Sequence, residues 1–359
     1  MQHLRRQSLK KAHRSASSVP SLCRFFSTEE REPIHRRPVV TFEDISTATY
    51  RVREGIQHTS CNYSAFLSKR MGYELFLKKD YRQMTGSFKE RGARNALMLL
   101  TPEQKQRGVI AASAGNHALA LAYHGRMLGI PVTCIMPTIA PLAKVKGCQE
   151  LGARVILHGA HILEAKIKAD EFVDTEDLVY INGFDHPNII AGAGTMGIEI
   201  LNQVPKADAI IVPVGGGGLI AGIALAVKTL NPSIQVIGVE PENCASFTAA
   251  LAAGHPVDTN TKPTLADGLA VPKVGANAFE VAAPLIDRMV TVSEKAIALS
   301  VLRLCELEKV VVEGGGAASL AALIDDKLPD LRVRFMQRAH QTLTTALATI
   351  AHDNAGASL

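Results

Sequence analysis

The sequence predicts a mostly parallel, doubly wound α/β protein, because of two features of its hydrophobic pattern. From about residue 42, short runs of apolar and β-branched residues alternate with longer stretches of helical periodicity. The short runs are apolar almost throughout, which is typical of parallel strands buried on both faces. Such alternation places helices on both faces of a parallel sheet. We expect strands at residues 74–78, 109–112, 132–136, 154–157, 209–214 and 235–239, and helices at residues 89–100, 117–128, 143–151, 162–171 and 219–229.

Length and composition indicate a soluble globular protein. The chain has 359 residues, of which 47% are hydrophobic, so it can bury a large core in one domain or two lobes. No stretch approaches the roughly 20 uncharged apolar residues of a membrane-spanning helix. The net charge is +5, but residues 1–28 contain six Lys or Arg and no acid, which leaves a net charge of −1 for the rest. We therefore expect neither a membrane nor a nucleic acid as partner.

The basic N-terminus predicts a mitochondrial presequence. Residues 1–28 are rich in Arg and Ser, lack acids and can form an amphipathic helix. The run Arg24-Phe25-Phe26-Ser27 resembles a matrix-protease processing site. We expect the protein in the mitochondrial matrix, or in the cytoplasm if this segment is only a disordered basic tail.

Four successive glycines after the expected strand 209–214 predict a phosphate-binding turn. Gly215, Gly216, Gly217 and Gly218 precede Leu219 and an expected helix. The N–H groups of such a turn, with the positive end of the helix, can bind a phosphate without a cationic side chain. The turn lacks the Gly-Lys-Ser/Thr ending of a Walker loop and does not match the dinucleotide-binding GxGxxG pattern. The alternative is a tight turn without a ligand, for which four glycines are entropically costly.

A lysine stands at the expected start of a capped helix. Ser87 is a suitable N-cap, and Glu90 follows three residues later, as in a capping box. Lys89 then lies in the first turn, where the positive end of the helix dipole favours the neutral, nucleophilic amine. Taken alone, this pattern is more typical of a surface lysine on a well-capped helix.

A third strand-to-helix turn follows the expected strand 109–112 and contains Ser113, Ala114, Gly115, Asn116 and His117. Hydroxyl, amide and backbone N–H groups at a helix N-terminus suit a carboxylate. His117 can equally be an ordinary capping residue, so this motif is only moderately specific by itself.

These three turns, in this order, resemble the fold-type II pyridoxal-phosphate family, and within it the threonine/serine dehydratases and serine racemases. The resemblance runs from about residue 42 to about residue 330 and implies a fold like tryptophan synthase β, with two doubly wound α/β domains. It implies a large cofactor-binding domain of residues 29–105 and 188–330 and a small domain of residues 106–187. Residues 1–28 would be the presequence and residues 331–359 an atypical tail.

The resemblance also implies how pyridoxal 5′-phosphate is held. Lys89, in Ser-Phe-Lys-x-Arg-Gly, would bind it as a Schiff base and later remove the substrate Cα proton. Phe88 would stack on the pyridine ring, and Asn116 would bind the 3′-oxygen. The glycines with Leu219 would hold the phosphate, and Glu313, in Val-Glu-Gly-Gly-Gly-Ala, would lie near the ring.

The implied reaction is loss of water from L-threonine or L-serine to give a 2-oxo acid and ammonia, in amino-acid catabolism or isoleucine biosynthesis. Ser113, Ala114, Gly115 and His117 would receive the substrate carboxylate. Racemases of the family carry a serine before the Gly-Asn of this turn, and Ala114 stands there in this chain. Because alanine cannot transfer a proton, elimination is favoured over the alternative, serine racemase. A homodimer is expected from the resemblance alone.

Two segments depart from the family pattern. Glu240 matches a cation-binding glutamate of racemase-like members, but Cys244 and Ser246 stand at the companion positions. Since hard cations prefer several oxygen ligands, we predict no metal. Residues 336–359 lack the hydrophobic strand and the Ser/Cys-Gly-Gly-Asn turn that face the pyridine nitrogen in the family. A catalytically impaired protein that still binds the cofactor is therefore the alternative from a different class.

Overall fold

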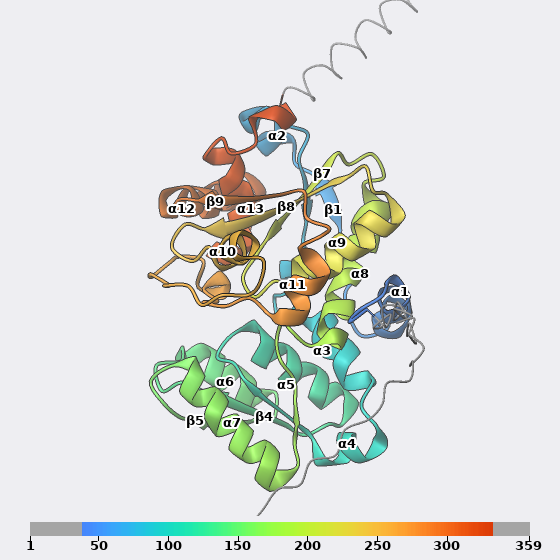
Figure 1. Cartoon of the computed structure of the whole chain (residues 1–359), viewed down its shortest axis with the longest axis vertical. Helices are drawn as coiled ribbons and strands as arrows, with labels where there is room; N and C mark the ends of the chain where they lie inside the picture. Colours follow the sequence, from blue (N-terminus) through green and yellow to red (C-terminus); the bar gives the residue numbers. More distant parts are fainter. Residues whose placement is uncertain (1–37, 333–359) are drawn as a thin grey trace, which may run out of the picture. The chain divides into compact units, whose positions relative to one another are not determined.

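The computed structural model describes residues 38–332 (Figure 1). The expected presequence lies outside this range, as does the tail beyond residue 332. In the part of the chain that is described, no helix is long and apolar enough to cross a membrane.

Two parallel sheets and one antiparallel pair make up the strands of residues 38–332. The first sheet has the order β5-β4-β3-β6, and the second has the order β7-β8-β9. The antiparallel pair is β1 with β2. The strands are β1 (Cys61–Tyr63), β2 (Phe76–Lys78), β3 (Val109–Ala112), β4 (Val132–Met136), β5 (Arg154–Leu157), β6 (Val179–Tyr180), β7 (Ala209–Pro213), β8 (Gln235–Pro241) and β9 (Arg288–Val292). All six predicted strands are confirmed; β1, β6 and β9 were not predicted.

The described residues contain thirteen α-helices, and the five that were predicted are among them. They are α1 (Phe42–Val52), α2 (Ala65–Met71), α3 (Lys89–Met98), α4 (Pro102–Arg107), α5 (Asn116–Leu128), α6 (Leu142–Glu150), α7 (Ile162–Glu176), α8 (Pro187–Gln203), α9 (Gly218–Leu230), α10 (Ser246–Ala253), α11 (Ala276–Ala282), α12 (Glu294–Arg303) and α13 (Gly314–Ile324). The predicted domain boundaries stay a prediction.

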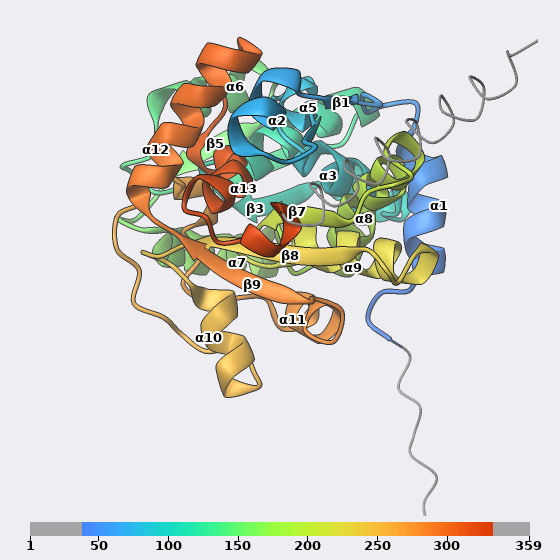
Figure 2. The same cartoon turned by 90° about the horizontal axis from the view of Figure 1, so that it is seen from above.

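Alternate residues of the strands enter different cores, which confirms the doubly wound α/β class. In β4, Cys134 and Met136 join the core that contains residues of α5 and α6, whereas Ile135 joins the core that contains residues of α7. In the second sheet, whose strands β7, β8 and β9 are labelled in Figure 2, Val236 joins the core that contains residues of α9, and Ile237 joins the core that contains residues of α13. Since successive side chains of a strand point to opposite faces, each sheet is covered by helices on both faces.

Helix α3 is packed tightly against α8 through two glycines. A Cβ atom at Gly192 of α8 would lie 2.5 Å from the carbonyl oxygen of Arg91 and 2.7 Å from Cα of Gly92. The two backbones are therefore in direct contact. The other side of α3 shares a core with α5, through Ala93, Ala96 and Leu97. These contacts fix the start of α3, where Lys89 lies.

The predicted capping box of α3 is wrong. The N-cap is Phe88, and the Ser87 hydroxyl accepts a hydrogen bond from the backbone N–H of Lys89 at 3.1 Å. The Glu90 carboxylate instead accepts from the backbone N–H and the hydroxyl of Thr85, and its other oxygen faces His124 Nε2 at 3.2 Å. Glu90 and His124 are both fully buried. The carboxylate therefore turns toward the imidazole on α5, a partner that no local pattern contains.

Candidate active site

Lys89 is the first residue of α3, and its amine is held against a backbone carbonyl. Its Nζ donates to the carbonyl oxygen of Gly183 at 2.5 Å and lies 5.3 Å from the centre of the Phe88 ring. Burial lowers the pKa of Lys89 to about 8. As expected, the Lys89 amine loses its proton more readily than a free lysine amine does, and desolvation is the cause of the lowered pKa. Such an amine supplies a nucleophile and a base in mildly alkaline solution.

The pH dependence of Lys89 acylation should reveal this shift without any cofactor. Only the neutral amine reacts, so its labelling rate is expected to rise with pH to a midpoint near 8. Exposed lysines of the same digest are the reference, since a free lysine amine titrates near pH ~10.4. Brief labelling with an amine-specific acylating reagent and peptide mass spectrometry would measure both. A Lys89 midpoint equal to that of the exposed lysines would contradict a buried amine.

The glycine turn between β7 and α9 is built for close backbone approach. A Cβ atom at Gly216 would lie 2.3 Å from the Phe184 ring, and one at Gly218 would lie 2.2 Å from the Phe184 carbonyl oxygen. Gly217 has φ +92°, which favours glycine. No side chain fits between this turn and Phe184, and the first N–H groups of α9, which have no intrahelical acceptor, are suited to bind an anion.

The segment 181–185, which follows β6, joins Lys89 to the glycine turn. Gly183 accepts the hydrogen bond from Lys89, and the next residue, Phe184, packs on the glycines. The Asn182 side chain closes the turn by accepting from the backbone N–H groups of Phe184 and Asp185, both at 2.9 Å. Sequence reasoning missed this segment. The available signal was an Asn-Gly pair after a short β-branched run, at the carboxyl end of a strand.

The turn from Ser113 to His117 connects β3 to α5. The Ser113 N–H donates to Ile135 at 3.1 Å, and a Cβ atom at Gly115 would meet no atom within 4 Å, so the turn borders open space. His117 is buried, and its Nε2 hydrogen bonds to the carbonyl oxygen of Ile181 at 2.9 Å. Burial and the nearby charge of Lys89 lower the pKa of His117 to about 3. The imidazole is thus neutral, and the groups of this turn that suit a carboxylate are the N–H groups that begin α5.

Asn116 and Glu313 meet in a cluster with a third residue, Lys144 of α6. The Asn116 Nδ2 donates to Glu313 Oε2 at 2.8 Å. The Lys144 Nζ donates to Asn116 Oδ1 at 2.8 Å and lies 3.4 Å from Glu313 Oε1. Sequence reasoning did not single out Lys144, because its partners are 28 and 169 residues away.

Glu240 has a structural role. Its Oε1 accepts from the N–H of Phe247 at 2.6 Å, and its Oε2 accepts from the N–H and the hydroxyl of Thr248 at 2.9 and 2.7 Å. Burial raises the pKa of this carboxyl above its usual range. Both oxygens are thus used to cap the start of α10.

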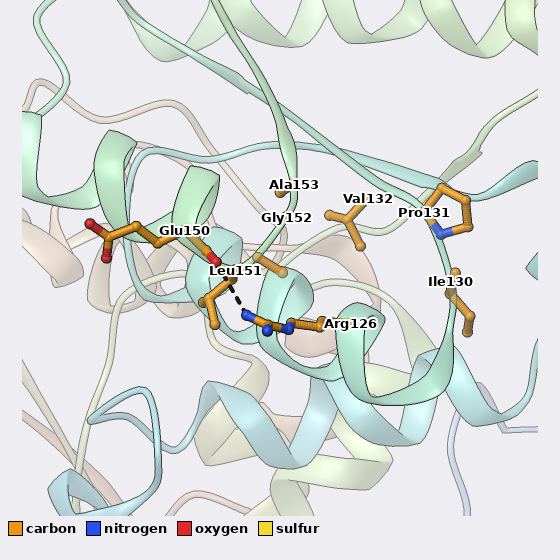
Figure 3. A pocket seen from close by; sticks show the side chains of 9 residues that line it. Arg126, Ile130, Pro131, Val132, Glu150, Leu151, Gly152 and Ala153 are labelled. Atoms are coloured by element: carbon orange, nitrogen blue, oxygen red, sulfur yellow. Dashed lines mark hydrogen bonds between the residues drawn. The ribbon is translucent and has the colours of Figure 1, made fainter.

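A pocket of about 380 Å³ lies at the amino-terminal ends of β4 and β5 (Figure 3). It is lined by Val132, the first residue of β4, and by Ala153, which precedes β5. Arg126, which also lines it, donates to the Glu150 carbonyl oxygen at 3.2 Å. Parallel α/β sheets bind ligands beyond the carboxyl ends of their strands, so this pocket is not the candidate active site.

The residues around Lys89 fit pyridoxal phosphate. The Lys89 amine can bind its aldehyde, and the turn from Gly215 to Leu219 can hold its phosphate without a cation. Asn116 offers an N–H donor to the 3′-oxygen, and Phe88 offers a ring beside the amine. The glycine turn decides the fit, because Phe184 leaves no room for a Cβ atom at Gly216 or Gly218 and the turn can therefore offer only backbone N–H groups to a phosphate.

Comparison with known proteins gives the same result. Residues 52–333 match the family described as pyridoxal-phosphate-dependent enzymes. The chain is 44% identical to L-threonine ammonia-lyase of Thermotoga maritima over 287 residues, which covers 80% of this chain and 72% of that protein. The processed form of threonine deaminase isoform 2 from Solanum lycopersicum has a TM-score of 0.76 and 35% identity, with 83% and 90% of the two chains covered. Serine racemase from Dictyostelium discoideum has a TM-score of 0.77 and 33% identity, with 81% and 94% covered.

These matches confirm the predicted family and its cofactor. They span the three turns that hold Lys89, Asn116 and the glycines, which the structure brings to one place. The chain belongs to the family of pyridoxal-phosphate-dependent enzymes.

Proposed function

We propose that this protein is a pyridoxal-phosphate-dependent ammonia-lyase that converts L-threonine and L-serine to 2-oxo acids and ammonia. The observation that carries the proposal is that Lys89 and the glycine turn contact consecutive residues, Gly183 and Phe184. A base and a phosphate cradle are thereby held side by side. The similarity to threonine ammonia-lyase and threonine deaminase supports this reaction.

Different residues of the chain serve different steps of the elimination. When bound, pyridoxal phosphate supplies an electron sink for the electron pair left at the substrate Cα. The N–H groups at the start of α5 bind the substrate carboxylate. The Lys89 Nζ, neutral above its pKa of about 8, accepts the Cα proton. His117 stays neutral and holds the 181–185 segment, whose Gly183 carbonyl positions that Nζ.

Ala114 favours elimination over racemisation. Racemisation needs a second group that transfers a proton on the opposite face of the substrate, whereas elimination uses one face. Ala114 packs against the core that contains residues of α5 and has no titratable atom. The second candidate, serine racemase, is supported by the similarity to the Dictyostelium enzyme, and the absence of a hydroxyl at this position speaks against it.

Product analysis of the cofactor-loaded protein tests the proposal. L-threonine is expected to give 2-oxobutyrate and L-serine to give pyruvate, each with one equivalent of ammonia. Oxo acids would be measured as hydrazones by liquid chromatography, and chiral analysis of the remaining serine would show no D-serine. D-serine as the main product would establish racemase activity instead. Bound cofactor with neither product would identify a protein that binds the cofactor without turnover.

We also propose mitochondrial matrix import and a homodimeric assembly. The six basic residues and the lack of acids in residues 1–28 support the first proposal. The second follows from the family resemblance. A role in amino-acid catabolism or isoleucine biosynthesis belongs to the same proposal.

A further inference from the structure

Lys144 makes hydrogen bonds that the proposed reaction does not use. It lies on α6 and donates to Asn116 Oδ1 at 2.8 Å, while Asn116 Nδ2 donates to Glu313 Oε2 at 2.8 Å. Its distance to Glu313 Oε1 is longer, 3.4 Å, and the Glu313 side chain is 52% exposed. An ion pair with so exposed a partner contributes little. The main partner of Lys144 is therefore the amide oxygen of Asn116.

The chemistry of the three groups fixes the direction of the Asn116 amide. An ammonium only donates, an ionised carboxylate only accepts, and an amide has one end of each kind. With Oδ1 toward Lys144, the Nδ2 must face Glu313. Rotating the amide by half a turn would place N–H against N–H and oxygen against carboxylate. Lys144 thus determines which end of Asn116 is available to other partners.

We propose that Lys144 is a positioning residue that holds Asn116 with its Nδ2 donor turned toward an anionic oxygen. In this structure Glu313 supplies that oxygen. In the loaded protein the 3′-oxygen of the cofactor, also an anionic acceptor, would take this hydrogen bond. The inference rests on the proposed function, because it assumes that the site holds pyridoxal phosphate.

Replacing Lys144 with methionine tests this role, because methionine is an unbranched side chain only one atom shorter than lysine and lacks the donor. The affinity for pyridoxal phosphate, measured by absorbance titration, is expected to fall about 5- to 10-fold. The absorption maximum of the bound cofactor is expected to shift, and the melting temperature of the cofactor-free protein should stay within a few degrees of wild type. Lys144→Arg, which restores a cationic donor, is expected to recover most of the affinity.

The control is Lys146→Met, the same change on an exposed residue of the same helix. It is expected to leave affinity and spectrum unchanged. An equal loss in Lys144→Met and Lys146→Met would overturn the proposal, because the effect would then be one of general surface charge.

A double-mutant cycle separates action through Asn116 from direct contact with the cofactor. If Lys144 acts through Asn116, adding Lys144→Met to Asn116→Ala is expected to weaken binding no further. Multiplying effects would overturn the positioning role. Wild-type protein without cofactor affinity would overturn both this inference and the proposed function, whereas equal affinity in wild type and Lys144→Met would overturn only the inference.

Discussion

Replacing Lys89 with alanine is expected to abolish formation of 2-oxo acid from L-threonine and L-serine, by on the order of a thousandfold or more. The variant loses both the amine that binds the cofactor aldehyde and the base that takes the Cα proton. No other described lysine contacts the carbonyl oxygen of Gly183, next to the glycine turn. Oxo-acid assay of wild type and variant at equal cofactor concentration would measure the loss.

Covalent attachment gives a second readout of the same variant. After borohydride reduction, wild-type protein is expected to carry one cofactor on the peptide that contains Lys89, and the variant none. The variant should fold, because the substitution removes a desolvated amine whose pKa burial has already lowered to about 8. Lys69→Ala, on an exposed residue of α2, is the control and should keep full activity. A folded Lys89→Ala protein with wild-type turnover would end the catalytic assignment.

The location of two of the three turns could be predicted from the sequence, because the turns with Asn116 and Gly215 each follow a parallel strand and begin a helix. Lys89 also begins a helix, but the strand before it, β2, belongs to the antiparallel pair, so its place beside the other two turns depends on the packing of α3. The reason for the lowered pKa of Lys89 could not be predicted in the same way. Lys89 does lie in the first turn of α3, but burial is the cause of the shift, and burial depends on Gly183 and other residues distant in the chain.

The wrong capping box at Glu90 and the missed Lys144 have the same physical origin. The pattern Ser87-x-x-Glu90 satisfies a capping box, yet Glu90 faces His124, 34 residues away and equally buried. The buried carboxylate is satisfied by Thr85 and by His124, which packing brings to it, and not by the N-cap N–H of a capping box. Lys144 was missed for a similar reason: nothing in its neighbourhood distinguishes it from the exposed Lys146, and only the folded chain brings it to Asn116.

Arg91, two residues after Lys89 in α3, is the centre of a buried ionic network. The Arg91 guanidinium is fully buried and makes paired hydrogen bonds to Asp80, at 2.6 and 2.9 Å, and to Glu199, at 2.7 and 2.9 Å. Lys78 Nζ donates to the same Glu199 at 2.6 Å, so two cations balance two carboxylates. Burial opposes ionisation of Asp80, but the bonds from Arg91 hold the pKa of its carboxyl below the usual range.

Arg91→Met is expected to lower the free energy of unfolding by about 3–5 kcal/mol, because it leaves two buried carboxylates facing one cation. Urea unfolding of the cofactor-free protein would measure this. Arg154→Met is the matched control: Arg154 also bonds both oxygens of a carboxylate, that of Glu176, but the two side chains are 52% and 39% exposed. An exposed pair contributes about 0–1 kcal/mol. Equal losses in the two variants would contradict a dominant role for the buried network.

The pH dependence of this difference has a definite sign. A carboxyl whose pKa is lowered by folding stabilises the protein above its unfolded pKa of roughly 3.9, and this contribution is lost as the pH falls through the folded value. The stability gap between wild type and Arg91→Met is therefore expected to be full at neutral pH and to narrow below about pH 4.

Because Arg91 lies two residues after Lys89 in α3, the variant should also bind the cofactor more weakly at neutral pH. Retained cofactor affinity despite the loss of stability would show that Arg91 stabilises α3 but does not position the Lys89 amine.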